Sequence, residues 1–270
     1  MSATSEPVKL SVRNVCKSFR LREASAGKDR VHSVLRDVNF DVRQGEIVSL
    51  IGESGCGKTT LLRIVQGLVS LDAGSVLVDG NSVTAPGRDR GFVFQQASLL
   101  PWRTARQNVE FGLELQRLPK AERTRRATRL LELVGLSHAA DQYPHQLSGG
   151  MQQRIGLARA LAIEPAILLM DEPFSALDAQ TRELLQGELM RIHEQTEKTT
   201  LFVTHDLDEA IYLSDRVVVL AANPGHVKRV ILVPFEHPRP ELAELRIDSR
   251  FQQIRAEMWS LIRTPSSVAA

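Results

Sequence analysis

A glycine-rich stretch between two apolar runs contains the residue types needed to hold phosphate. Residues 47–51 are apolar enough for a buried strand, and residues 61–68 have the apolar spacing of a helix. The glycines between them allow several backbone N–H groups to point toward one spot, beside the positive end of the helix dipole. Lys58 can reach a terminal phosphate, and the Thr59 hydroxyl can hold magnesium. The residues of this predicted nucleotide site are Gly52, Glu53, Ser54, Gly55, Cys56, Gly57, Lys58, Thr59 and Thr60.

A pair of carboxylates follows another apolar run. Residues 167–170 indicate a buried strand that ends at Asp171 and Glu172, and ligands of open α/β sheets gather at such strand ends. We expect Asp171 to hold magnesium together with Thr59, and Glu172 to polarise an attacking water. The alternative, an ordinary acidic turn, is disfavoured because the same chain carries a phosphate loop.

Two further polar residues follow expected strands. Gln95 comes after residues 91–94, and His205 comes after residues 200–204. Both could complete a ring around a γ-phosphate, Gln95 through magnesium or water and His205 through a hydrogen bond. Taken singly, either residue would more often be a loop residue whose hydrogen bonds are satisfied locally.

A second helix start with anion-binding character lies far along the chain. Ser148 is a favourable N-cap, Gly149 and Gly150 expose backbone N–H groups, and a helical apolar pattern follows. A chain with one phosphate loop therefore has two helix starts suited to phosphate. One of them has no evident partner within the same chain.

Strands that alternate with helices must position these residues. Such alternation predicts a parallel, right-handed α/β sheet, and a hairpin at Asp79–Gly80 adds a small antiparallel sheet beside it. The expected strands cover residues 8–19, 34–42, 47–51, 75–78, 82–83, 91–94, 167–170, 200–204, 217–220 and 227–235. A polar loop is expected over residues 20–30.

Helices dominate residues 104–162, which we interpret as an inserted lobe. Within it, residues 120–134 form a basic amphipathic pattern whose arginines are expected to face solvent rather than lipid headgroups. Asp206 and Glu209 are spaced for a capping box at the start of a later helix. The chain is expected to end in a helix with one apolar side, formed by Phe251, Ile254, Met258 and Leu261.

Composition narrows the class of protein. The 270 residues are 43% hydrophobic, and the formal charge of +2 gives no general affinity for nucleic acid. Cys16 and Cys56 give no disulfide framework and suit a reducing cytosol. We expect neither a signal peptide nor a membrane span, because no apolar run approaches about 20 residues. A role at a membrane would then require a partner.

Taken in order, these motifs resemble those of the ATP-binding cassette (ABC) ATPases. The resemblance rests on the phosphate loop, Gln95, the LSGG run at 147–150, the acidic pair at 171–172, SALD at 175–178 and His205, and it covers about residues 8–233. It implies a P-loop NTPase (RecA-like) parallel core with an antiparallel β subdomain and an inserted α-helical subdomain. It also implies ATP and Mg2+ as ligands, and hydrolysis of ATP to ADP and phosphate.

The same resemblance assigns roles that spacing alone does not give. Ser148, Gly149 and Gly150 would bind the γ-phosphate held by another copy, so each site would need two chains, as a homodimer or a heterodimer with a second ABC ATPase. Asp178 would communicate across that dimer. Phe19 or a neighbour would stack on adenine, although the polar insert after Phe19 departs from the family pattern.

Within the family, the segment after Gln95 and the short tail resemble importers of nitrate, sulfonate, taurine and bicarbonate. Region 95–102, which ends at Trp102, would dock an integral-membrane permease that works with a solute-binding protein, at the cytoplasmic face of the inner membrane. The alternative for Trp102 is a place in the core of the helical lobe. Alternative functions are a soluble ABC ATPase, the ATPase half of an exporter, and a nucleotide-gated scaffold without hydrolysis.

The expected division of the chain follows from these assignments. Residues 1–96 and 153–235 would form the ATP-binding core with its antiparallel subdomain. Residues 97–152 would form the helical subdomain, and residues 236–270 the C-terminal helical tail. The transported solute is not determined by this chain.

Overall fold

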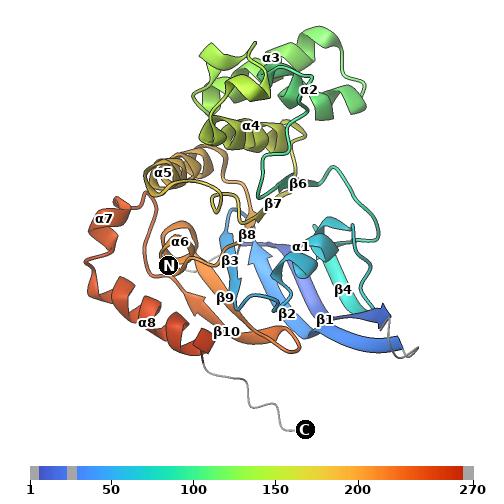
Figure 1. The fold of residues 1–270 in the computed structure, drawn as a ribbon, viewed down its shortest axis with the longest axis vertical. Coiled ribbons are helices and arrows are strands. Elements are labelled where there is room, and N and C mark those ends of the chain that lie inside the picture. The colour runs from blue at the N-terminus through green and yellow to red at the C-terminus, as the bar shows by residue number, and fades with distance from the viewer. Residues whose placement is uncertain (1–5, 23–28, 264–270) are drawn as a thin grey trace.

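The computed structural model describes residues 6–22 and 29–263, and its centre is a six-stranded sheet with the order β10-β9-β3-β8-β7-β6 (Figure 1). Five strands are parallel and β10 pairs antiparallel with β9. This is the predicted α/β class. The strands are β3 (Ile47–Gly52), β6 (Arg90–Val93), β7 (Ile167–Asp171), β8 (Thr200–Val203), β9 (Arg216–Ala221) and β10 (His226–Leu232).

Strand β3 runs through the middle of this sheet and is buried along its whole length. Its side chains alternate, because Ile47 and Ile51 join one hydrophobic cluster while Val48 and Leu50 join another. A strand that is covered on both faces has a nearly continuous apolar sequence, as β3 does apart from Ser49. Both faces of the sheet are therefore covered.

A second, antiparallel sheet lies beside the first, with the order β2-β1-β4-β5 (Figure 1). Its core face carries Leu10 and Val12, which are fully buried and pair with Val78 and Phe40 on neighbouring strands. The predicted hairpin at residues 79–80 is confirmed. The strands are β1 (Val8–Arg22), β2 (Asp29–Arg43), β4 (Ala73–Val78) and β5 (Asn81–Ser82).

Helices enclose the central sheet and form a separate lobe above it (Figure 1). The lobe consists of α2, α3, two short 3-10 turns and part of α4, and α4 also contacts β6. Helix α4 is thus the crossover from β6 to β7 and a wall of the lobe at once. The helices are α1 (Lys58–Gln66), α2 (Ala105–Leu115), α3 (Lys120–Leu133), α4 (Gly149–Ala162), α5 (Ala179–Thr196), α6 (Leu207–Leu213), α7 (Leu242–Leu245) and α8 (Ser249–Arg263).

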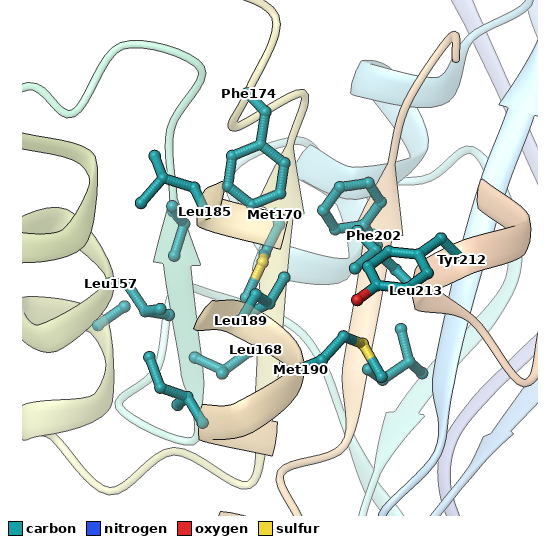
Figure 2. Close-up of a cluster of buried hydrophobic side chains, with 14 of the residues drawn as sticks. Leu157, Leu168, Met170, Phe174, Leu185, Leu189, Met190, Phe202, Tyr212 and Leu213 are labelled. Atoms are coloured by element: carbon teal, nitrogen blue, oxygen red, sulfur yellow. The ribbon is translucent and has the colours of Figure 1, made fainter. Parts of the chain in front are cut away.

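Helix α5 covers the sheet through an apolar stripe (Figure 2). Leu185 and Leu189 lie near Met170 of β7 and Phe174, and Phe174 packs against Phe202 of β8 with ring centroids 6.0 Å apart. These contacts fix the ends of β7 and β8, which carry the acidic pair and His205.

The structure bears on three of the predictions made for individual elements. Strands β1 and β2 extend into the expected loop, to Arg22 and from Asp29, and the rest of that loop lies outside the described residues. The boundary expected at residues 152/153 falls inside α4, which is one continuous helix. The division of the chain into subdomains stays a prediction. Asp206 does cap α6, but Glu209 does not complete the capping box.

Glu209 turns into the core instead of reaching back to the helix start. Its carboxyl group accepts hydrogen bonds from Thr204 Oγ1 and from Gln186 Nε2 on α5, the second at 3.0 Å. Burial raises the pKa of Glu209, which favours its protonated form. The capping-box prediction was wrong because these tertiary contacts compete for the same side chain.

The C-terminal segment is fastened to α6. Arg239 donates to the carbonyl groups of Ile211 and Tyr212 at the end of that helix. At the other end, Asp208 forms ion pairs with Arg246 and Arg255 at 3.0 and 2.7 Å. As predicted, α8 buries Phe251, Ile254 and Met258, and Leu261 lies half-buried beside them.

Candidate active site

The phosphate loop connects the central strand β3 to α1. Gly52 has φ +157°, and a side chain there would place Cβ only 2.5 Å from the carbonyl oxygen of Leu220. Gly57 caps α1 in the left-handed region, at φ 94°. Both positions therefore require glycine, and they turn the backbone so that α1 begins beside the end of β3.

Lys58 lies within its own loop. Its ammonium group is hydrogen-bonded to the carbonyl groups of Gly52 at 2.8 Å and Glu53 at 3.1 Å. Cys56 is fully buried next to it, and this burial raises the pKa of the thiol. Cys56 thus fills space inside the loop, while Lys58 places a positive charge at its centre.

Thr59 and Asp171 come together from elements 112 residues apart. The Thr59 hydroxyl donates to the Asp171 carboxylate at 3.2 Å. Burial raises the pKa of Asp171 above its usual value, so a nearby cation would favour the ionised carboxylate. A hydroxyl and a carboxylate are oxygen ligands of the kind that Mg2+ prefers, so the donor set fits that ion.

Glu172 is held in an unusual backbone conformation at the end of β7. Its φ is 45°, in the left-handed region that costs a non-glycine residue free energy. Its N–H donates to the carbonyl of Val203 at 2.9 Å, and its carboxylate lies 3.1 Å from Nδ1 of His205. Neighbouring strands β7 and β8 therefore bring the predicted base and the predicted histidine into contact.

One groove of about 540 Å³ joins these parts. Its walls come from the phosphate loop on one side and from Glu172 and His205 on the other. One lysine, the start of helix α1 and a carboxylate therefore meet at the carboxyl end of the parallel strands. Such a site can catalyse phosphoryl transfer by positioning and charge stabilisation. The lining residues are Val34, Ser54, Gly55, Gly57, Lys58, Thr59, Thr60, Glu172 and His205.

Gln95 follows β6 and does not line this groove. Its side-chain amide donates to Ser175 Oγ at 3.0 Å, and that hydroxyl donates to the carbonyl of Glu172 at 2.9 Å. Gln95 is thus connected to the acidic pair through Ser175. The sequence analysis did not identify this link, because it depends on the pairing of β6 with β7.

Ser148 caps α4, as predicted, and accepts a hydrogen bond from the N–H of Met151 at 3.3 Å. Ser148 and Gly149 are exposed and do not line the groove, whereas Gly150 packs against Thr181 of α5. Asp178 caps α5 by accepting from the N–H of Thr181 at 3.0 Å, a hydrogen bond that lowers the pKa of Asp178. These two helix starts therefore lie together, apart from the phosphate loop.

Two aromatic side chains that the sequence singled out are exposed. Phe19 on β1 is 39% exposed, does not line the groove, and has Lys17 Nζ 5.2 Å from its ring centroid. Trp102 is 70% exposed, so the alternative of a place in the lobe core is wrong. The buried side chain of Asn108 holds the loop before Trp102 through two hydrogen bonds to Leu100. It accepts from the N–H of Leu100 and donates to the carbonyl of the same residue.

Within residues 6–22 and 29–263, no helix is both long enough and apolar enough to cross a bilayer.

Comparisons with known proteins agree on one family. The sequence pattern described as ABC transporter matches residues 35–175. An uncharacterised ABC transporter ATP-binding protein of Methanocaldococcus jannaschii is 49% identical over 95% of this chain and 92% of its own length. The nitrate import ATP-binding protein NrtD of a Synechocystis strain is 42% identical over 90% of this chain and 93% of its own length. A dimeric ATP-binding cassette solved with ADP and Pi superposes with a TM-score of 0.72 at 34% identity, covering 84% of this chain and 100% of that structure's chain.

Proposed function

Because the chain belongs to the ABC transporter family and is an ATP-binding, ATP-hydrolysing subunit with a P-loop NTPase core, we propose that it powers import of a small solute through a separate permease. The nitrate import relative, aligned over nearly its whole length, supports import. It disfavours an exporter half or a soluble, non-transport ATPase.

Nitrate, a sulfonate such as taurine, and bicarbonate are the candidate solutes, delivered by a solute-binding protein. The chain would sit peripherally on the cytoplasmic face of the inner membrane.

The groove supplies a role for each of its polar side chains. Lys58 and the loop N–H groups would hold the β- and γ-phosphates, and Glu172 would accept a proton from the attacking water. His205, in contact with Glu172, would orient that carboxylate and form a hydrogen bond with the γ-phosphate. Thr59 and Asp171, with Gln95 through water, would hold Mg2+, which supplies charge neutralisation on the phosphates when bound.

The observation that carries the proposed mechanism is the separation of the two phosphate-binding helix starts. Lys58 lines the groove, whereas Ser148 and Gly149 are exposed outside it. A helix start with free N–H groups attracts phosphate, and the ATP-binding cassette solved with ADP and Pi is a dimer. We therefore infer that Ser148, Gly149 and Gly150 of one copy close over the ATP held by another, with Asp178 beside them at the contact.

Mixing two inactive variants tests this inference. Lys58→Ala should lose ATP affinity, and Ser148→Arg should block the second helix start with a bulky charge. In a mixture, a dimer with one copy of each keeps one site in which both halves are intact. ATP turnover, measured as phosphate release at fixed total protein, should therefore recover to roughly a quarter of the parent rate, since random pairing puts half of the chains in mixed dimers with one working site of two.

Each variant alone at the same total concentration is the control and should stay inactive. Absence of any recovery, at every mixing ratio, would contradict a site shared between two chains. Recovery with unrelated inactive pairs, such as Lys58→Ala mixed with Glu172→Gln, would also contradict it, because both of those changes affect the same half-site.

Two surface assignments complete the proposal. Region 95–102 leads from Gln95, which is linked to Glu172 through Ser175, to Trp102, whose exposed ring would fill a pocket on the permease. Phe19, which lies on β1 beyond the part of that strand that pairs with β4, would stack on adenine. Its exposed ring supports that role, and its place outside the groove lining requires adenine to extend beyond the phosphate cleft.

A further inference from the structure

Gln153 is a buried amide at the junction of the helical lobe and the core. It lies in the first half of α4, and only 6% of it is exposed. Helix α4 begins at Ser148, which we place against the γ-phosphate of a second copy. Any displacement of that helix start therefore reaches Gln153 within about two turns of a continuous helix.

The amide group of Gln153 contacts two separate loops. Nε2 donates to the carbonyl of Gln95 at 2.7 Å, with a longer contact of 3.3 Å to the carbonyl of Phe94. The same nitrogen donates to the carbonyl of Pro173 at 2.6 Å. Pro173 directly follows Glu172 in the chain. One side chain thus holds the segments that carry both Gln95 and Glu172.

Other contacts of α4 do not make this connection. Arg159 donates to the carbonyls of Ala97 and Ser98, so it holds the loop after Gln95 but not the turn after Glu172. Gln152, the neighbour of Gln153, donates to the carbonyls of Pro144 and Leu147, both within the lobe. Of these three side chains, only Gln153 reaches the residue after Glu172.

We propose that Gln153 is a positioning residue for ATP hydrolysis. Its amide keeps the Gln95 loop and the Glu172 turn at a fixed separation, and it transmits the position of the Ser148 helix start to both. The inference rests on the proposed function, because it takes Glu172 and Gln95 as working groups. It adds a mechanical link between the phosphate contact of one copy and the hydrolytic carboxylate of the same copy.

Gln153→Met tests the link, because methionine has a similar volume and no donor. We expect kcat for ATP to fall about tenfold or more while KM and the affinity for ATP stay within about twofold, since the change affects the transition state and not the phosphate loop. Gln152→Met is the matched control. It removes a similar pair of amide hydrogen bonds one residue away and should keep kcat within about twofold.

Retained kcat in Gln153→Met would overturn the inference, and so would an equal loss of kcat in Gln152→Met. A fall in ATP affinity that accounts for the whole loss would also overturn it. If Gln153→Met does not fold, Gln153→Asn keeps the donor but shortens its reach, and the same split between kcat and KM is expected. Full activity in Glu172→Gln would instead overturn the proposed role of Glu172, whatever Gln153→Met does.

Discussion

At the scale of single residues, Glu172 combines an unfavourable backbone with a position suited to chemistry. Its φ of 45° and its contact with His205 aim the carboxylate into the groove beside Lys58. Glu172→Gln keeps the shape and the ATP-binding loop but removes the base. We expect ATP to bind with unchanged affinity, phosphate release to fall by about a hundredfold or more, and ATP-bound dimer to accumulate, as measured by light scattering.

Glu164→Gln is a matched control for that change. Glu164 also has a positive φ, at 53°, but it pairs with Arg126 on the lobe, away from the groove. Its variant should hydrolyse ATP like the parent. Turnover at the parent rate in Glu172→Gln would remove Glu172 as the catalytic base.

The residue types in the groove could be predicted from the sequence, and the connections between them could not. Lys58, Thr59, Glu172 and His205 follow strands in recognisable patterns, and the structure brings them together. Gln153 escaped prediction because its partners are backbone carbonyls 20 and 58 residues away. No spacing rule within one helix reveals such partners. The roles assigned to the site residues stay predictions.

At the scale of elements, α6 connects the strand end that carries His205 to the C-terminal tail. The helix begins two residues after His205, and Asp208 in its first turn holds Arg246 and Arg255 of the tail. Asp208→Asn leaves both guanidinium groups without this carboxylate. We expect the free energy of unfolding in urea to fall by about 1 kcal/mol, with faster hydrogen exchange in α8.

Glu188→Gln provides the comparison for Asp208→Asn. Glu188 pairs with Arg191 three residues later in α5, so its ion pair joins nothing distant. Its loss should leave hydrogen exchange in α8 unchanged. If hydrogen exchange in α8 is equally fast in both variants and in the parent, Asp208 does not hold the tail.

The elements themselves followed the apolar patterns closely. Hydrophobic alternation located β1 and β2, and continuous apolar runs located β3, β7 and β9. Local rules failed at Glu209, where a helix-capping pattern was overridden by Thr204 and Gln186 from the folded core. Spacing describes neighbours in the chain, whereas buried polar groups take partners from the fold.

At the scale of the whole molecule, Trp102 is a large apolar side chain held on the surface by an ordered loop. If it anchors a permease, Trp102→Glu should abolish retention of the permease in a pull-down from detergent-solubilised native membranes. The melting temperature of the isolated chain should change by no more than about 2 °C, because the ring is mostly in solvent. The ABC family assignment made from the sequence is confirmed by the comparisons, whereas this interface is still a prediction.

The second tryptophan supplies a matched surface change. Trp259 on α8 is 55% exposed and lies on the tail, away from the lobe (Figure 1). Trp259→Glu should retain the permease as the parent does. Loss of the permease in both variants, or in neither, would contradict a docking role for region 95–102.

The left-handed backbone conformation of Glu172 places fold stability and ATP turnover in conflict at a single residue. Glycine would adopt that φ without steric strain and would relieve roughly 1–3 kcal/mol, partly offset by the larger conformational entropy that glycine loses on folding, while deleting the carboxylate. A laboratory selection for heat resistance alone would therefore favour glycine at 172 and enrich an inert protein. Only a selection that also demands solute uptake would keep glutamate there.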